Sequence, residues 1–300
     1  MQALLDTIAQ ATPGQDACRI FHGRGGLHPG CEHLSLDWFA PVWLLTSFQP
    51  LSEAEILTVQ AALAQRPEPL NLVVQIRQSG QGGSDTRLVC GEVPQPHVVT
   101  EQGARYRLHV LKGQNHGLFL DMACGRQWLR EQAQGQRVLN LFAYTCAFSV
   151  AALQGGAAEV VNVDMAAGAL AIGQQNHQLN DLNGARFLAH DLFKSWGKIK
   201  RMGPYDLVVA DPPSYQKGSF VAHKDYARVV RRLPELLAPG GQALLCLNAP
   251  ELPSRFLQEL VAQQAPQLQF VRRLDNPAVF ADADPERSLK VMLFENPLAV

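Results

Sequence analysis

The stretch "DLVVADPPSYQKG", residues 206–218, joins an apolar run of strand length to an acid, two prolines and an aromatic residue. A run that stays apolar throughout is typical of a strand buried on both faces of a parallel sheet. Proline stiffens the backbone and cannot donate to a strand ladder, so Pro212 and Pro213 mark the exit from this strand. The stretch therefore predicts a buried strand that ends at Asp211 and presents this acid on a rigid backbone.

Four further apolar runs lie in the second part of the chain, and most of them precede a segment with helical spacing. They are RVLNLF at 137–142, EVVNVD at 159–164, ARFLAH at 185–190 and QALLCLN at 242–248. Strands that alternate with helices favour an α/β fold, in which helices cover both faces of a parallel sheet. In such a doubly wound, Rossmann-like fold, ligands bind beyond the carboxyl ends of the strands. Functional residues are therefore expected directly after each run.

The first part of the chain predicts a small α+β domain over residues 1–112, before the doubly wound domain at 113–300. HLSLDWF and VWLLTSF are strand-like, and a capping box at Ser52 and Glu55 then begins a helix of about four turns. NLVVQIR and RLVC predict two more strands, and HVVT with RYRLHVL predicts a hairpin. The expected order is strand, strand, helix, strand, strand and hairpin.

The charges of the chain nearly cancel, with a formal net charge of −1, so a polycationic nucleic-acid coat is excluded. Residues 1–110 hold 7 Lys+Arg against 10 Asp+Glu, and residues 111–300 hold 19 against 17. The basic residues of the second part form two clusters, Lys194, Lys198, Lys200 and Arg201, and Arg228, Arg231 and Arg232. Each cluster fits either contact with phosphates or an ordinary solvated face.

The six cysteines are all more than four residues apart, so no paired zinc or redox motif is expected. The chain shows no secretory pattern and no apolar span of bilayer length, which predicts a cytoplasmic protein without a membrane partner. His28, Cys31 and His33, with His22 nearby, have a spacing that could chelate a metal. A fourth ligand at the usual distance is not evident, so no metal is expected.

The first two runs of the second part lead into residues suited to a nucleoside cofactor. Residues 142–149, FAYTCAFS, have mostly small side chains that let a ligand approach the backbone. Asp164 follows the second run, 24 positions beyond Asn140, where a doubly wound fold places the acid that holds ribose hydroxyls. Asp is also a favoured cap residue, so Asp164 fits equally well as the cap of the next helix.

The third run is followed by Asp191 and Leu192, which suit an exocyclic amine and the face of a base. A cap or turn role for Asp191 is again the alternative. Three acids at successive strand ends describe a nucleoside pocket. A dinucleotide oxidoreductase would show a G-x-G-x-x-G loop after the first strand, whereas this loop has no glycine. S-adenosylmethionine, a nucleoside without phosphates, is therefore the predicted cofactor.

The opening stretch then completes the site on the substrate side. Asp211 and the carbonyls fixed by Pro212 and Pro213 are placed to accept hydrogen bonds from a planar, nitrogen-bearing target, and Tyr215 offers a face for stacking. Methyl transfer from a sulfonium depends on in-line placement, so a rigid backbone assists it. The alternative is that the prolines only form a tight exit from the strand.

Taken in order, these residues resemble the class I S-adenosylmethionine-dependent methyltransferases, and more narrowly the bacterial 23S ribosomal RNA large-subunit methyltransferases that act on cytosine C5 or guanine N7. The matching segments cover the last two-thirds of the chain: GQNHGLFLD (113–121), VLNLFAYTCAFSVAAL (138–153), VVNVD (160–164), NHQLN (176–180), DPPSY (211–215) and LAPGGQALLCLN (237–248). The expected order of strands in the first part also resembles the small domain of that family.

The resemblance implies roles for individual residues. Asp121 and Arg126 would flank the cofactor, and the 142–147 loop would pass under its methionine part. Asp164 would hold the ribose, and Asp191 would face the adenine. The full cofactor set is Asp121, Arg126, Asn140, Phe142, Ala143, Tyr144, Thr145, Asp164, Met165, Asp191 and Leu192. The resemblance also implies that Asp211, Pro212, Pro213 and Tyr215 face the substrate, with Lys217 and Asn248 as further substrate contacts.

Three features depart from the family pattern. Cys146 and Ala147 stand where the first loop usually has glycines. The RNA-binding module that precedes the small domain in cytosine-type members is expected to be missing. Those members carry a nucleophilic cysteine after the fifth strand, because carbon methylation needs a covalent adduct. This chain has Asn248 there, and Cys246 lies two residues earlier, about 6–7 Å away along a strand. Nitrogen methylation is therefore favoured.

The leading hypothesis is an S-adenosylmethionine-dependent methyltransferase that modifies a base nitrogen of RNA, with ribosomal RNA as the expected partner. A non-catalytic RNA or protein adaptor on a methyltransferase scaffold is the first alternative, because the first loop is altered. A nicotinamide-dependent oxidoreductase is the second, and the loop without glycine counts against it. The oligomeric state stays open, and Trp38 and Trp43 fit the core better than an interface.

Overall fold

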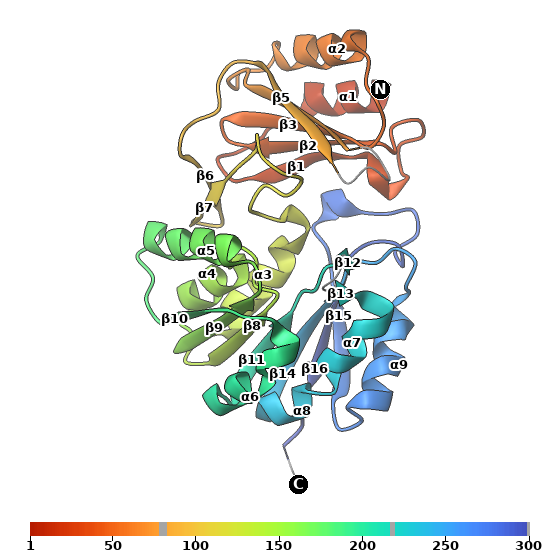
Figure 1. The fold of residues 1–300 in the computed structure, drawn as a ribbon. Coiled ribbons are helices and arrows are strands. Elements are labelled where there is room, and N and C mark those ends of the chain that lie inside the picture. The colour runs from red at the N-terminus through yellow and green to blue at the C-terminus, as the bar shows by residue number, and fades with distance from the viewer. Residues whose placement is uncertain (78–82, 217–219, 299–300) are drawn as a thin grey trace. The chain divides into compact units, whose positions relative to one another are not determined.

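The computed structural model describes residues 1–77, 83–216 and 220–298. The chain folds into two compact units (Figure 1). The small unit comprises Met1–Leu120 and Pro277–Pro285, and the large unit comprises Asp121–Asn276 and Glu286–Val300. The chain thus passes from the small to the large unit after Leu120, whereas the sequence predicts a boundary after residue 112. A short segment near the C-terminus also returns to the small unit.

The small unit is built on a five-stranded sheet of order β1-β2-β3-β4-β5. The strands are β1 (Cys18–His22), β2 (Leu34–Phe39), β3 (Val42–Ser47), β4 (Leu72–Arg77) and β5 (Ser84–Cys90), and the helices are α1 (Gln2–Gln10) and α2 (Glu53–Leu63). β3 and β4 run parallel, and the other pairs are antiparallel. Both helices contribute to one apolar core, which includes Trp38 and Trp43 with their rings 4.5 Å apart. The two tryptophans are core residues, as expected.

The capping box predicted from the sequence is present at the start of α2. The Ser52 hydroxyl accepts from the Glu55 amide at 3.3 Å, and the Glu55 carboxylate accepts from the Ser52 amide at 2.8 Å. The helix has 11 residues, about three turns instead of four. The predicted hairpin is also present, as β6 (His97–Glu101) and β7 (Ala104–Leu108). The sequence analysis did not find α1 and β1.

The large unit has a seven-stranded sheet of order β10-β9-β8-β11-β14-β16-β15. The strands are β8 (Arg137–Leu141), β9 (Glu159–Asp164), β10 (Ala185–Ala189), β11 (Tyr205–Ala210), β14 (Leu237–Leu247), β15 (Gln269–Leu274) and β16 (Lys290–Glu295). The five predicted strands pair in parallel, and β16 and β15 add an antiparallel edge. The order reverses between β8 and β11, so the predicted ligand site lies beyond the ends of these strands.

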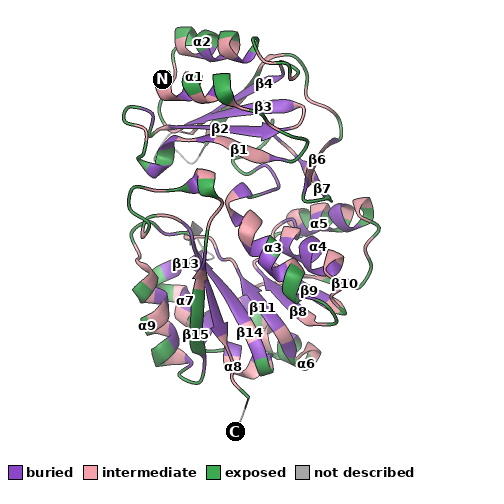
Figure 2. Ribbon diagram, turned by 180° about the vertical axis from the view of Figure 1, so that it is seen from behind, coloured by how far each residue is buried: buried purple, intermediate pink, exposed green. Residues whose placement is uncertain are grey.

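Helices cover both faces of this sheet, as the uniformly apolar strands predict. On one face, Leu139, Val161 and Val208 pack with side chains from α6, α7, α8 and α9. On the other, Val138 and Val160 pack with side chains from α3 and α4. The helices are α3 (Ala123–Gln132), α4 (Ala147–Gln154), α5 (Ala167–Leu179), α6 (Leu192–Met202), α7 (Ala222–Val230), α8 (Leu233–Leu236) and α9 (Ser254–Gln264). Figure 2 shows the central strands as buried between these layers.

Short elements complete the two units. They are the 3₁₀ turns η1 (Gly23–Gly25), η2 (Leu120–Met122) and η3 (Ala278–Phe280), and the strands β12 (Tyr215–Gln216) and β13 (Phe220–Val221). Within the described ranges, no helix has both the length and the apolar character that crossing a membrane requires.

Candidate cofactor and substrate site

The loop between β8 and α4 has an unusual backbone for a loop without glycine. Phe142, Tyr144 and Cys146 have φ angles of 58°, 48° and 62°, in the left-handed region that side chains with a Cβ seldom adopt. The amide of Ala143 donates to the Val163 carbonyl at 3.1 Å, and this bond attaches the loop to the end of β9. The predicted cofactor loop is therefore a tight turn held at the carboxyl edge of the sheet.

Cys146 stands where the family usually has a glycine, and a glycine on a neighbouring helix makes room for its side chain. Cys146 is fully buried, and a Cβ added at Gly173 of α5 would lie 2.5 Å from its Sγ atom. No real Cβ contact is that short, so Gly173 makes room for the thiol. Burial, with a smaller effect from Asp164, raises the pKa of this thiol far above its usual value. Cys146 therefore fills space as a neutral group and offers no thiolate.

Asp164, at the end of β9, holds the loop and the start of α5 together. Its Oδ2 accepts from the Tyr144 amide at 2.8 Å, and its Oδ1 accepts from the Ala166 amide at 2.8 Å. The N-cap of α5 is Ala166, without a side-chain cap bond, so Asp164 does not cap the helix itself but holds the residue before it. Each carboxylate oxygen has a second acceptor site, so both bonds leave room for a ribose diol. The adjacent Met165 is 53% exposed.

Asp191, at the end of β10, is the N-cap of α6. Its carboxylate accepts from the Phe193 amide at 2.9 Å and lies 3.3 Å from the Lys194 Nζ. The cap interpretation is confirmed, and contact with the adenine stays a prediction. Leu192 is buried beneath it in the core.

A buried polar row, which the sequence analysis did not find, runs beneath the loop. The Asn140 amide donates to Asn162 at 2.9 Å, Asn162 donates to the Ser149 hydroxyl at 3.0 Å, and Ser149 bonds to His177 at 2.8 Å. His177 also bonds to the Gly173 carbonyl at 2.7 Å, and burial lowers its pKa. The side chain of Asn140, a predicted cofactor residue, is thus committed to joining β8, β9, α4 and α5. The sequence does not reveal this row, because its four residues come from four elements, β8, β9, α4 and α5, which only the fold brings together.

Asp211 follows β11 and shares its surroundings with two other predicted site residues. Its amide donates to the Leu141 carbonyl at 3.4 Å, next to the cofactor loop. The residue keeps some exposed surface, but burial of its carboxyl raises the pKa to about 7. The nearby Asp121 raises it further, and Arg126 opposes the shift. The structure thus brings together Asp121, Arg126 and Asp211, which are far apart in the sequence.

Tyr226 of α7 forms hydrogen bonds with the ends of β11 and β14, the two strands that precede Asp211 and Asn248. Its fully buried hydroxyl lies 2.9 Å from the Cys246 carbonyl and 3.4 Å from the Ala210 carbonyl. Cys246 lies inside β14 without exposed surface, and burial raises the pKa of its thiol well above the usual value. Asn248 follows β14 and is exposed. The hydroxyl therefore fixes Asp211 and Asn248 relative to one another.

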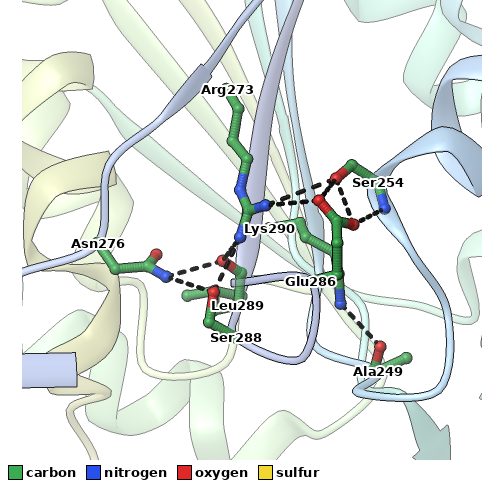
Figure 3. Close-up of polar contacts among 8 residues, drawn as sticks. All are labelled: Ala249, Ser254, Arg273, Asn276, Glu286, Ser288, Leu289 and Lys290. Atoms are coloured by element: carbon green, nitrogen blue, oxygen red, sulfur yellow. Dashed lines mark hydrogen bonds and ion pairs between the residues drawn. The ribbon is translucent and has the colours of Figure 1, made fainter. Parts of the chain in front are cut away.

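The loop that follows Asn248 is anchored by a buried lysine. Lys290, the first residue of β16, has no exposed surface, and its Nζ donates to the Ala249 carbonyl at 2.9 Å. A polar network joins Ser254, at the start of α9, with Arg273 of β15, with Asn276 and with residues 286–289 (Figure 3). It includes bonds from Ser254 to Glu286, from Arg273 to Glu286, Ser288 and Leu289, and from Asn276 to Ser288 and Leu289.

Pro212 is buried and Pro213 is half-buried. The backbone of Tyr215 pairs with Val221, and Lys217 lies outside the described residues. Across the part of the chain that the structure describes, no group of three His, Cys, Asp or Glu side chains could hold a metal.

The site residues fit S-adenosylmethionine by their chemistry. Carboxylates at Asp164 and Asp191 suit a diol and an amine, and the exposed Met165 suits the face of a base. Asp121 and Arg126 offer one charge of each sign, which suits the ammonium and carboxylate of a methionine moiety. The close contact between the buried Gly173 and Cys146 fixes the 142–147 loop.

The strand order, the antiparallel edge and the acids at the strand ends together define the class I methyltransferase fold. A family model described as S-adenosylmethionine-dependent methyltransferase matches residues 18–295, so the chain belongs to this family. S-adenosylmethionine is accordingly the cofactor. The resemblance and the fold class expected from the sequence are confirmed.

Curated relatives carry a more specific description. The chain is 36% identical over 188 residues to ribosomal RNA large subunit methyltransferase I of Aeromonas hydrophila, covering 60% of this chain and 47% of that protein. It is 34% identical over 187 residues to the protein of the same name from Aeromonas salmonicida, with the same coverage. The chain spans about half the length of these curated relatives.

Solved structures share the fold over nearly the whole chain. A protein from Streptococcus mutans described as a SAM-dependent methyltransferase superposes with a TM-score of 0.83 at 23% identity, over 98% of this chain and 81% of that one. A methyltransferase solved in complex with SAH gives the same TM-score at 24% identity and the same coverage. At these identities the likeness concerns the fold alone.

Proposed function

We propose that the protein transfers a methyl group from S-adenosylmethionine to a base nitrogen of RNA, and that ribosomal RNA is the substrate. The observation that carries the proposal is the convergence of Asp211 and its two prolines with Asp121, Arg126 and the cofactor loop at one edge of the sheet. The relatives named as ribosomal RNA methyltransferases support the choice of RNA.

The bound cofactor supplies an electrophilic methyl group on a sulfonium. In the proposal, the Asp211 carboxylate accepts a hydrogen bond from an N–H of the base, and the rigid Pro212–Pro213 backbone directs carbonyls toward the same group. Both contacts would orient the nitrogen lone pair toward the methyl donor, and the Asp211 carboxylate would accept the proton that the nitrogen loses. Because the pKa of Asp211 is raised to about 7, its side chain changes from a protonated carboxyl to an accepting carboxylate near neutral pH.

Nitrogen is favoured over carbon because neither cysteine next to the ends of β8 and β14 is a suitable nucleophile. Methylation at cytosine C5 needs a thiolate that adds to the ring. The Cys246 thiol is buried inside β14, and the Cys146 thiol is buried beside Gly173, with the pKa of both raised by burial. Asn248, the exposed residue after β14, can donate and accept hydrogen bonds but cannot form the adduct.

The first experiment is calorimetric titration of S-adenosylhomocysteine into wild type, Asp164→Ala and the control Glu259→Ala, which alters an exposed carboxylate on α9. We expect micromolar binding to wild type and the control, and none to Asp164→Ala. Absence of binding to wild type, or preferential binding of NADH, would overturn the cofactor assignment.

The second experiment incubates wild type with ribosomal RNA and labelled S-adenosylmethionine and identifies the labelled nucleoside by chromatography. An N-methylated nucleoside supports the proposal. A 5-methylcytidine would contradict the choice of nitrogen. Cofactor binding without transfer to any RNA would instead support a non-catalytic adaptor.

A further inference from the structure

Two basic clusters that are separate in the sequence lie on two neighbouring helices of the large unit, which are joined by contacts of Arg228 with Phe193 and of Arg232 with Trp196. We define the α6–α7 face by Lys194, Lys198 and Arg201 of α6, and by Arg228 of α7 with Arg231 and Arg232 directly after it. All six residues are exposed. Both helices pack on the same side of the sheet, through the core that also holds α8 (Figure 1).

Stacking of arginines on aromatic rings joins the two halves of this face. The Arg228 guanidinium carbon lies 3.6 Å from the ring centre of Phe193, and that of Arg232 lies 6.0 Å from the ring of Trp196. Such stacking restricts the side chain and leaves the guanidinium edge available for hydrogen bonds. The face therefore presents preorganised cationic groups, which a solvated surface with mobile side chains does not.

Positive charge exceeds negative charge on this face. Asp191, Asp225 and Glu235 form ion pairs with Lys194, Arg228 and Arg232, and Glu235 also pairs with Lys200 of α6. The paired side chains are still accessible, since those of Lys194, Arg228 and Arg232 are 84%, 49% and 45% exposed. A polyanion could therefore bind the exposed basic side chains of this face without displacing the three acids from their ion pairs.

A row of aromatic rings connects the face with the cofactor loop. The ring of Phe142, in the loop, lies 5.2 Å from that of Phe220. Phe220 stacks on Phe193 with 6.4 Å between ring centres and 9° between planes, and Phe193 lies 6.3 Å from Trp196. The face thus begins close to the residues that are proposed to hold the cofactor.

We propose that the α6–α7 face binds backbone phosphates of the RNA next to the methylated nucleotide. This inference rests on the proposed function. The rings of Phe193 and Trp196 are already covered by guanidinium groups, so the face positions the RNA through its charges and does not read its bases. Binding should release counterions and depend strongly on salt.

The test measures fluorescence anisotropy of a labelled, mixed-sequence single-stranded RNA 20-mer with wild type and two triple variants, at 50 to 300 mM salt. The face variant is Lys198→Gln/Arg228→Gln/Arg231→Gln. The matched control is Arg255→Gln/Arg272→Gln/Arg287→Gln, which removes three exposed arginines elsewhere in the large unit. Titration of S-adenosylhomocysteine checks that each variant is folded.

We expect the face variant to lose roughly two units of the slope of log K against log salt, and on the order of tenfold or more in affinity at 150 mM salt. Its cofactor affinity and the RNA affinity of the control should stay near wild type. Equal losses in both triple variants, or an unchanged slope in the face variant, would overturn the inference while wild type still methylates RNA. If wild type neither binds nor methylates RNA, the proposed function itself fails.

Discussion

At the scale of single residues, Asp211 links the pH dependence of stability with that of activity. Its pKa is raised from 3.8 to about 7, chiefly by burial. Between these values, the folded protein keeps a proton that the unfolded chain has released. The free energy of unfolding therefore falls as the pH rises from about 4 to about 7, by at most roughly 4 kcal/mol before partial exposure is discounted.

Asp211→Asn should flatten this dependence, because its amide does not titrate. Urea unfolding at pH 5 and pH 8 should show a larger gain in stability over wild type at pH 8. Methyl transfer by wild type should rise with pH through about 7, and the variant should lose both this rise and most of the activity. Equal effects of the variant on stability at both pH values would show that the pKa of Asp211 is not raised in the folded protein.

The pair Cys146 and Gly173 predicts strong coupling between two substitutions. Gly173→Ala alone places a Cβ against the thiol and should cost roughly 1–3 kcal/mol of stability. In a Cys146→Gly background the clash is gone, and alanine also favours the helix by up to about 1 kcal/mol. The second substitution should then be neutral or stabilising. Additive effects in denaturant unfolding of the four proteins would show that the two residues do not compensate one another.

This pair also shows where sequence reasoning stops. The sequence shows that Cys146 stands in place of an expected glycine, and it places the loop correctly after β8. It cannot show that a glycine on α5, 27 positions later, provides the missing space, because the contact depends on how α5 packs. The same holds for Tyr226, whose hydroxyl acts on two strand ends that only the sheet brings together.

At the scale of elements, the loop after β14 is positioned by a charged residue on another strand. Lys290→Met keeps the length of the side chain but leaves the Ala249 carbonyl without its donor. We expect faster hydrogen exchange over residues 249–254 and a decrease in kcat/KM for RNA on the order of tenfold, because Asn248 loses its placement. The affinity for S-adenosylhomocysteine should not change.

Lys112→Met, at an exposed position of the small unit, is the control and should behave as wild type. A merely structural role for Lys290 would lower the melting temperature without slowing RNA turnover at temperatures where the variant is folded. Unchanged exchange in the loop would also exclude the positioning role.

The elements differ in how readily a sequence reveals them. Four of the five parallel strands, β8, β9, β11 and β14, are mostly buried, and all five are apolar runs broken by at most a few polar residues, so all five were predicted. β15 is exposed at four of its six positions and lies at the sheet edge, so it has neither a continuous nor an alternating apolar pattern. Its partner β16 is apolar, but without β15 its place in the sheet could not be predicted.

At the scale of the whole molecule, the returning segment Pro277–Pro285 is part of the small unit. Phe280 of η3 is 8% exposed, its ring lies 5.1 Å from that of His22, and the Arg19 guanidinium carbon lies 4.7 Å from its centre. The Ala283 amide also donates to the Gly25 carbonyl at 2.7 Å. The small unit therefore depends on residues that the chain supplies only near its end.

Phe280→Ala should destabilise the small unit by roughly 3 kcal/mol, as for other buried phenylalanines. Hydrogen exchange in β1 should become faster, and exchange in β8 and β11 should stay near wild type. Phe270→Ala, at a 43% exposed phenylalanine of β15, should leave β1 unaffected. Equal acceleration in both variants would show that Phe280 has no specific role in the small unit.

The returning segment also sets the order in which the protein can be completed during synthesis. Residues 1–120 of the small unit are synthesised before residues 121–276 of the large unit, yet they lack Phe280 and Ala283 until residue 283 has been translated. The large unit, in turn, lacks β16, which pairs with both β14 and β15, until after that segment. A nascent chain that stops before residue 277 therefore lacks part of the small unit and the strand that joins β14 to β15 in the large unit.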